Sequence, residues 1–260
     1  MKSLSQHVKE EFNFRINRDS AKNVYSYFPK TNDELRKIIE DHYTAGIYDL
    51  NDIDVSQIKD FSDLFFKDNN TGNPEFDVSR WDVSNGEDFS WMFYGCDNFN
   101  GNLSNWNVSK GINFKKMFSC CTNFDADISN WDVSKGENFV HMFNKCINFN
   151  ADLSRWDVSK VENMQGMFKF CEKFICDLSG WNIHNAINLS YMFYNCINFN
   201  CNLSNWDVSK CKYFNNMFSN CEKFNADLSN WDVSSGEDFA NMFIYCPIKQ
   251  EFKPKHKDIR

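Results

Sequence analysis

A tryptophan recurs every 25 residues through most of this 260-residue chain. The members of this column are Trp81, Trp106, Trp131, Trp156, Trp181, Trp206 and Trp231. Periods of about 20 to 50 residues are typical of repeat proteins, in which one unit cannot bury its apolar side chains alone and stacks on its neighbours. We therefore expect a stack of similar units rather than one conventional globular core.

Other positions keep the same period. A Val, Leu or Ile lies three residues before each Trp, a Met-Phe pair follows it, and a cysteine closes each unit. These cysteines are Cys96, Cys121, Cys146, Cys171, Cys196, Cys221 and Cys246. An imperfect copy at 49–65 has Ile53 in the tryptophan position, and extra residues around 67–74 separate it from Trp81. The repeats therefore extend over about 47–246.

The second half of each unit has the pattern of a short helix. In the segment 159–171, Met164, Met167 and Phe168 have the i, i+3, i+4 spacing of one helical face. Ser159 and Glu162 match a capping box. The same pattern recurs at Ser84/Glu87, Ser134/Glu137 and Ser234/Glu237. We therefore expect a short helix after each tryptophan.

The first half, 149–158 in the same unit, is rich in Asn, Asp and Ser and predicts a turn followed by a short strand around Leu153. Strands stack about 4.8 Å apart and helices about 8–10 Å apart, so such a coil must curve with its strands inside. The expected fold is an α/β repeat solenoid, a leucine-rich-repeat-like curved array with a short strand plus a short helix in each 25-residue coil.

The repeated pattern F-x-x-C-x-x-F-N-x-D-L-S-x-W-D-V-S-x-V-x-N-M-x-x-M-F resembles the BspA-like leucine-rich-repeat family, in the variant known from Mycoplasma-type domains of unknown function. The resemblance covers about 49–246. It implies a repeat scaffold for protein or surface binding, and it implies no catalytic residues.

Three regions follow from these patterns. Residues 1–46 are expected to form an N-terminal lead and a helical cap, because Thr31 and Glu34 match a capping box before an apolar helix face. Residues 1–28 themselves have a weak pattern, read as another helix or a loose lead. Residues 47–246 form about eight repeats, the first degenerate. Residues 247–260 are a C-terminal cap or tail, and their basic run is interpreted as solvated.

Charge and cysteine content limit the classes of function. The net charge of -8 disfavours nucleic acid as the main partner, because phosphate contacts need a basic face. No stretch approaches the roughly 18 apolar residues of a membrane span, and no signal-peptide pattern begins the chain. Eleven cysteines without such a signal are interpreted as reduced thiols, which favours an intracellular location.

Two columns could hold a metal. The cysteines lie 25 residues apart rather than in the short pairs typical of zinc sites, so a buried thiol ladder at the helix end is favoured. Aspartates and asparagines could bind calcium, but turn residues that bond their own backbone explain them more simply. These columns are Asp127, Asp152, Asp177 and Asp227, and Asn100, Asn150, Asn200 and Asn225. Calcium binding stays open, and we expect no cofactor.

The sequence contains no recognised catalytic motif, and its five histidines are scattered. The leading hypothesis is therefore a non-enzymatic repeat scaffold that binds a protein partner on a curved surface. The alternatives are a structural or self-assembling repeat protein, with weak self-association, and an enzyme with an unrecognised site. Partner-binding positions are expected beside the tryptophans, where residues differ between units: Arg80, Asn105, Asn130, Arg155, Asn205 and Asn230. Arg80 and Arg155 are the strongest candidates, because arginine is enriched at binding hot spots; solvated surface arginines are the alternative.

Overall fold

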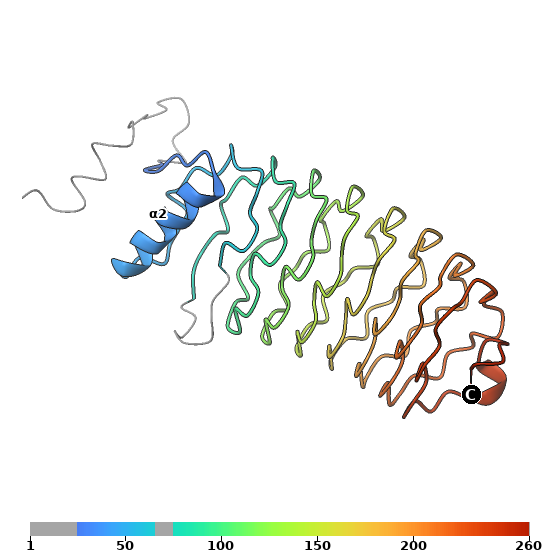
Figure 1. Cartoon of the computed structure of the whole chain (residues 1–260). Coiled ribbons are helices and arrows are strands. Elements are labelled where there is room, and N and C mark those ends of the chain that lie inside the picture. Colours follow the sequence, from blue (N-terminus) through green and yellow to red (C-terminus); the bar gives the residue numbers. More distant parts are fainter. Residues whose placement is uncertain (1–24, 66–74, 260) are drawn as a thin grey trace, which may run out of the picture.

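The structure is a computed structural model that describes residues 25–65 and 75–259. Figure 1 shows a row of stacked coils, with helix α2 (Asn32–Thr44) against one end. The short 3-10 helix η1 (Gln250–Phe252) lies at the other end. The expectations for most of residues 1–28 and for the inserted residues 67–74 lie outside the described residues.

The predicted α/β solenoid with a strand plus a helix per coil is wrong. In the described part of the chain, α2 is the one α-helix and no extended strand occurs. Neighbouring coils are joined instead by isolated parallel bridges, such as Asn138 with Asn163 and Asn163 with Asn188. From Asp60 onward the bridges therefore fall in the half predicted to be helical. The half predicted to be a strand forms a turn, in which the backbone N–H of Trp156 donates to the Leu153 carbonyl at 3.1 Å.

Hydrogen bonds between coils replace those of the predicted helix. The N–H groups of Met164, Gly166 and Phe168 donate to carbonyls of the next coil, at 2.9–3.0 Å. The backbone N–H groups of Met167 and Lys169 instead donate to carbonyls three residues earlier in the same coil, as in β-turns. In an α-helix, each of these N–H groups would donate to the carbonyl four residues earlier in the same coil. The predicted capping boxes are consequently not helix caps.

The spacing of the coils explains why helices do not form. Ring centroids of Phe118 and Phe143 lie 5.8 Å apart, and those of Phe143 and Phe168 also lie 5.8 Å apart. Helices need about 8–10 Å between their axes, so a helix in every coil would push these rings out of contact. The turns that fit carry a cost, because thirteen described residues other than glycine have positive φ. Each such residue costs roughly 1–2 kcal/mol, which the contacts between coils must offset.

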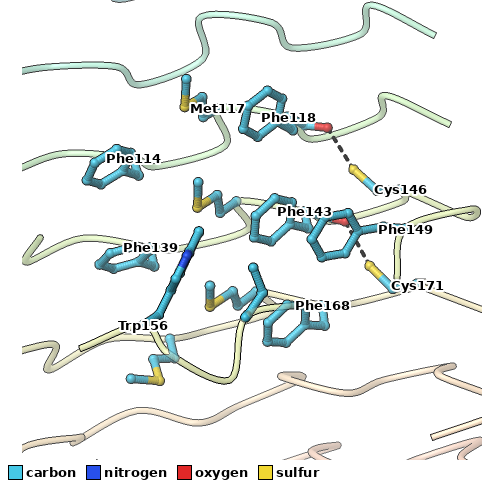
Figure 2. Packing of buried hydrophobic residues seen from close by; sticks show 14 of the residues in the cluster. Phe114, Met117, Phe118, Phe139, Phe143, Cys146, Phe149, Trp156, Phe168 and Cys171 are labelled. Carbon is cyan, nitrogen blue, oxygen red and sulfur yellow. Dashed lines mark hydrogen bonds between the residues drawn. The ribbon is translucent and has the colours of Figure 1, made fainter. Parts of the chain in front are cut away.

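The predicted columns do form the core. The tryptophans of the 25-residue column are only 3–5% exposed, and the Met-Phe pairs lie beneath them. Figure 2 shows Phe143 between Phe118 and Phe168, with Phe149 packed against it. The degenerate first coil follows the same plan, because Ile53 is fully buried in the tryptophan position.

The N-terminal cap helix is confirmed. In α2, the Thr31 hydroxyl accepts from the Glu34 N–H at 3.2 Å, and the Glu34 carboxylate accepts from the Lys30 N–H at 2.7 Å. The apolar face of α2 is buried through Leu35, Ile38 and Ile39. The helix thus covers the apolar edge that the first coil would otherwise expose.

Of the two alternatives for the C-terminal segment, a cap or a tail, the structure shows a segment packed on the last coils, while Lys249, Lys255 and Lys257 of its basic run are exposed. The Leu228 N–H donates to the Phe252 carbonyl at 2.8 Å, and Ile248 and Ile259 are buried. The His256 ring packs on Phe239, with centroids 4.4 Å apart. The segment therefore covers the last coils as α2 covers the first.

Candidate interaction surface

The predicted partner-binding residues lie together in one row, which we call the corner column. It comprises Arg80, Asn105, Asn130, Arg155, Asn205 and Asn230, all exposed. Each lies in a turn that is closed by a hydrogen bond from the backbone N–H of the tryptophan to the carbonyl three residues earlier, as from Trp156 to Leu153. The structure thus brings these residues together along the stack, on turns rather than on the strands predicted for this half of the coil.

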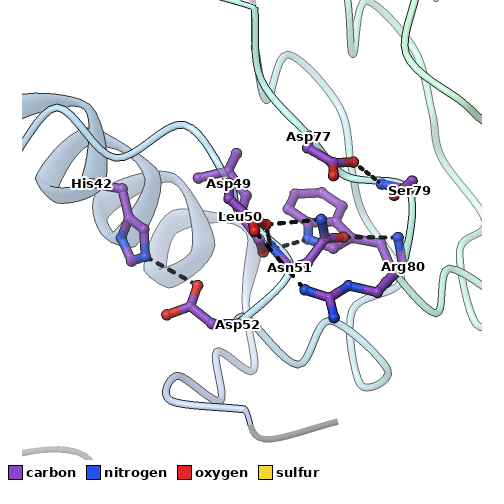
Figure 3. Close-up of polar contacts among 9 residues, drawn as sticks. His42, Asp49, Leu50, Asn51, Asp52, Asp77, Ser79 and Arg80 are labelled. Atoms are coloured by element: carbon purple, nitrogen blue, oxygen red, sulfur yellow. Dashed lines mark hydrogen bonds and ion pairs between the residues drawn. The ribbon is translucent and has the colours of Figure 1, made fainter. Parts of the chain in front are cut away.

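The two arginines of the corner column have different surroundings. Figure 3 shows Arg80 turned toward the first coil, with its guanidinium 4.0 Å from the Asp49 carboxylate. The Arg80 N–H also donates to the Asn51 side chain at 2.7 Å. At Arg155, the neighbouring Asp152 carboxylate has a lowered pKa, mainly because Ser154 donates to it and partly because of the arginine charge. Both guanidinium groups therefore lie beside carboxylates of the protein itself.

The aspartate and asparagine columns have two different roles. Asp152 accepts from the Ser154 N–H at 2.9 Å, and Asp127 accepts from the Ser129 N–H at 3.0 Å, so the predicted turn role of the aspartates is confirmed. Asn150 instead accepts from the N–H of the next coil at Ile175, at 2.8 Å. The asparagines therefore hold the coils together. Among the described residues, no group of three or more His, Cys, Asp or Glu side chains could hold a metal ion.

The cysteine column is a ladder of thiols, and all eleven cysteines are free. The Cys146 thiol donates to the Phe118 carbonyl at 2.9 Å, and the Cys171 thiol donates to the Phe143 carbonyl at 3.0 Å (Figure 2). Burial raises the pKa of both thiols well above its usual value. The predicted buried ladder is confirmed, although it does not lie at a helix end.

A second surface, which we call the turn face, lies on the segments predicted to be helical. It comprises Trp91, Tyr94, Lys116, His141, Lys169, Phe170, Tyr191 and Tyr194, all partly exposed. The Lys116 ammonium lies 3.9 Å from the Trp91 ring centroid. The Lys169 ammonium lies 4.9 Å from the Tyr191 centroid and 5.2 Å from the Tyr194 centroid. Two cation–π clusters therefore lie on this face.

His141 lies between the two clusters in sequence, one coil after Lys116. Its Nδ1 atom is buried and has no hydrogen-bond partner. The backbone of Gly166 lies so close to the ring that a Cβ at this position would overlap Nδ1. Burial lowers the pKa of His141, and the charges of Lys116 and Lys169 lower it further.

The sequence contained one signal for the turn face. Trp91 is the one tryptophan outside the 25-residue column, and Tyr191 and Tyr194 stand where the next coil has Asn216 and Ser219. These aromatic residues break the repeat, and a core role does not require them. The sequence does not predict that these aromatic side chains lie beside lysines of neighbouring coils, because their segments match the pattern of short helices.

Comparison with known proteins gives a family. Neither the curated proteins nor the solved structures gave a match to the chain. Within residues 25–65 and 75–259, no helix is both long and apolar enough to cross a membrane. A family model matches residues 33–154, 110–195 and 171–253, which together span most of the chain. The chain therefore belongs to the family described as Mycoplasma protein of unknown function, DUF285.

Proposed function

We propose that this protein is a non-catalytic scaffold that binds a protein partner on its turn face. The observation that carries the proposal is the presence of two clusters of partly exposed aromatic and lysine side chains at positions that depart from the repeat. Tyrosine and tryptophan are enriched at interfaces because they bring large contact area with few rotatable bonds. The resemblance to BspA-like leucine-rich-repeat scaffolds also supports a binding role.

The backbone beneath the turn face favours such a role. Trp91 and Tyr191 have positive φ, and their N–H groups donate to the next coil at 2.9 and 3.0 Å. Side chains on a backbone held in this way lose little further freedom on binding, and less ordering entropy means tighter binding. The stack therefore presents its variable side chains in an arrangement that exists before the partner arrives.

Self-assembly by end-to-end stacking is the less favoured alternative. Helix α2 buries Leu35, Ile38 and Ile39 at one end, and residues 247–259 bury Ile248 and Ile259 at the other. Covered ends oppose the addition of further coils, because little apolar edge is left for a second copy. Light scattering after gel filtration tests this alternative: a mass that rises with concentration would favour assembly over the scaffold.

The scaffold is tested with variants that take their new residues from other coils of the same chain. Tyr191→Asn/Tyr194→Ser copies Asn216 and Ser219 of the next coil, so the turns should fold normally. The matched corner-column variant is Arg80→Asn/Arg155→Asn, which copies Asn105 and Asn130. Each purified protein is immobilised and used to capture partners from a lysate of the source cells, with quantitative mass spectrometry.

We expect the tyrosine variant to lose a partner that the wild type and the arginine variant both capture. Loss only with the arginine variant would move the binding face to the corner column. If no protein is enriched by the wild type over both variants, the proposal is wrong.

A further inference from the structure

Two lysines of the turn face are partly buried without a negative partner. Within the described residues, neither Lys116 nor Lys169 forms an ion pair or donates a hydrogen bond from its ammonium group. An ammonium has three donors and no acceptor, so a partly buried one without an anion carries a desolvation cost, which the neighbouring aromatic rings offset only in part. Burial accordingly lowers the pKa of both lysines.

Positive charge accumulates around His141. The charges that act most strongly on this imidazole are those of Lys116, Lys169 and Lys115. Lys145 acts in the same way on Lys169. In a chain with a net charge of -8, this concentration of basic groups is a local exception. Lys115 shares a surface hollow with Glu137 and Glu162, so the charges that an arriving anion would stabilise are those of Lys116 and Lys169.

The two lysines are separated along the stack by two coil steps. The Lys116 ammonium lies over Trp91 of the preceding coil and the Lys169 ammonium lies beside Tyr191 of the following coil, so the two clusters are centred about three coils apart. With stacked Phe rings 5.8 Å apart at each step, this separation is about 17 Å, which an extended peptide of about five residues spans. The aromatic rings beside each ammonium provide apolar contact for the stem of a bound side chain. A single small anion would reach only one cluster.

We propose that the turn face binds an extended acidic segment of a partner protein, with carboxylates at Lys116 and Lys169. This inference rests on the scaffold function proposed above and names the chemistry of its partner. A long polyanion such as nucleic acid is disfavoured, because the rest of the acidic surface would repel its flanking phosphates. A short acidic segment meets only the basic part of the face.

The test uses a fluorescein-labelled octapeptide of glutamate, with fluorescence anisotropy at low and physiological salt. The variant Lys116→Asn/Lys169→Asn takes its residues from Asn216 and Asn144, which occupy the same positions in other coils. The control Lys110→Asn/Lys210→Asn removes the same charge from another column, where Asn85 and Asn185 already occur. We expect the first variant to weaken binding at least about five-fold and the control to change it less than about two-fold.

Several results would overturn the inference. These are no binding of the peptide by the wild type, an equal loss in both variants, or tighter binding of an eight-residue oligothymidylate than of the peptide. The capture experiment separates this inference from the scaffold itself. If Lys116→Asn/Lys169→Asn keeps a partner that the tyrosine variant loses, the scaffold stands and the acidic segment is wrong. If the peptide binds as expected and no partner is captured, the site stands and the scaffold function is wrong.

Discussion

The indole N–H of Trp156 donates to the carbonyl of Ile128 in the preceding coil, at 3.1 Å. The same bond joins Trp131 to Leu103 and Trp181 to Leu153. These carbonyls are buried, and a buried acceptor without a donor is costly. The tryptophan column therefore fills the core and also bonds the half of the coil that, from Trp106 onward, has no bridge to its neighbour.

Trp156→Phe should separate these two contributions. We expect it to lower the free energy of unfolding by about 1–3 kcal/mol, because the Ile128 carbonyl loses its donor. Trp156→Ala should cost about 3–5 kcal/mol, because it also leaves a cavity. Urea unfolding followed by circular dichroism measures both values. A phenylalanine variant as stable as the wild type would show that the hydrogen bond contributes nothing.

Gly166 tests the turns that replace the predicted helices. It has φ +58, and a Cβ there would overlap the His141 ring, so Gly166→Ala should cost about 2–3 kcal/mol. Gly46→Ala is the matched control, because Gly46 has φ +72 and open space around it. We expect the control to cost only about 1 kcal/mol. Adding His141→Asn to Gly166→Ala should restore part of the stability; if it restores none, the overlap is not the cause.

The repeat and its buried columns could be predicted because stacked coils place like residues on like residues. The spacing of Met164, Met167 and Phe168 could not distinguish a helix from successive turns, because both place residues three and four apart on one side. The deciding quantity is the distance between coils, 5.8 Å at Phe143 and Phe168. That distance is set by ring stacking and backbone hydrogen bonds between neighbouring coils, so it cannot be inferred from the sequence of one unit alone.

The candidate site was predictable only in part. Exposure of the corner column followed correctly from its variability between coils, but its binding role stays a prediction. The turn face departs from the repeat just as clearly at Trp91 and Tyr191, yet a departure from the repeat does not by itself indicate a binding role. Its cation–π clusters depend on positive φ values at these residues, which the residue types do not predict.

Buried thiols should make the protein lose stability in alkali. Burial raises the pKa of Cys201 and of Cys211 to about 12. A group whose pKa is raised on folding contributes stability below its unfolded pKa, near 9, and this contribution is lost as pH rises toward the folded value. We therefore expect the urea midpoint to fall between pH 9 and pH 11 under reducing conditions. Cys201→Ala/Cys211→Ala, which copies Ala226 and Ala186, should fall less; an identical decline would assign the effect to other groups.

The cap helix should be anchored most strongly below neutral pH. His42 Nδ1 lies 2.8 Å from the Ile38 carbonyl, and Nε2 lies 3.2 Å from the Asp52 carboxylate (Figure 3). Only the protonated ring donates at both nitrogens. Burial lowers the pKa of His42, but the hydrogen bonds to Asp52 and Ile38 outweigh it, so the pKa is raised. The contribution is therefore complete below the unfolded value of about 6.5 and is lost as pH rises through the folded pKa.

Asp52→Asn measures this contribution. At pH 5.5 we expect it to lower the free energy of unfolding by about 1–2 kcal/mol, because it removes the charge from the acceptor of a charge-assisted hydrogen bond. As the pH rises through the folded pKa of His42 toward pH 8.5, the ring loses its proton, and the difference should shrink. Asp54→Asn is the control, because Asp54 accepts from the Ser56 N–H of its own turn and has no histidine partner. Its effect should be the same at both values of pH. If Asp52→Asn costs as much at pH 8.5 as at pH 5.5, the neutral ring already makes the contact and His42 does not titrate in this range.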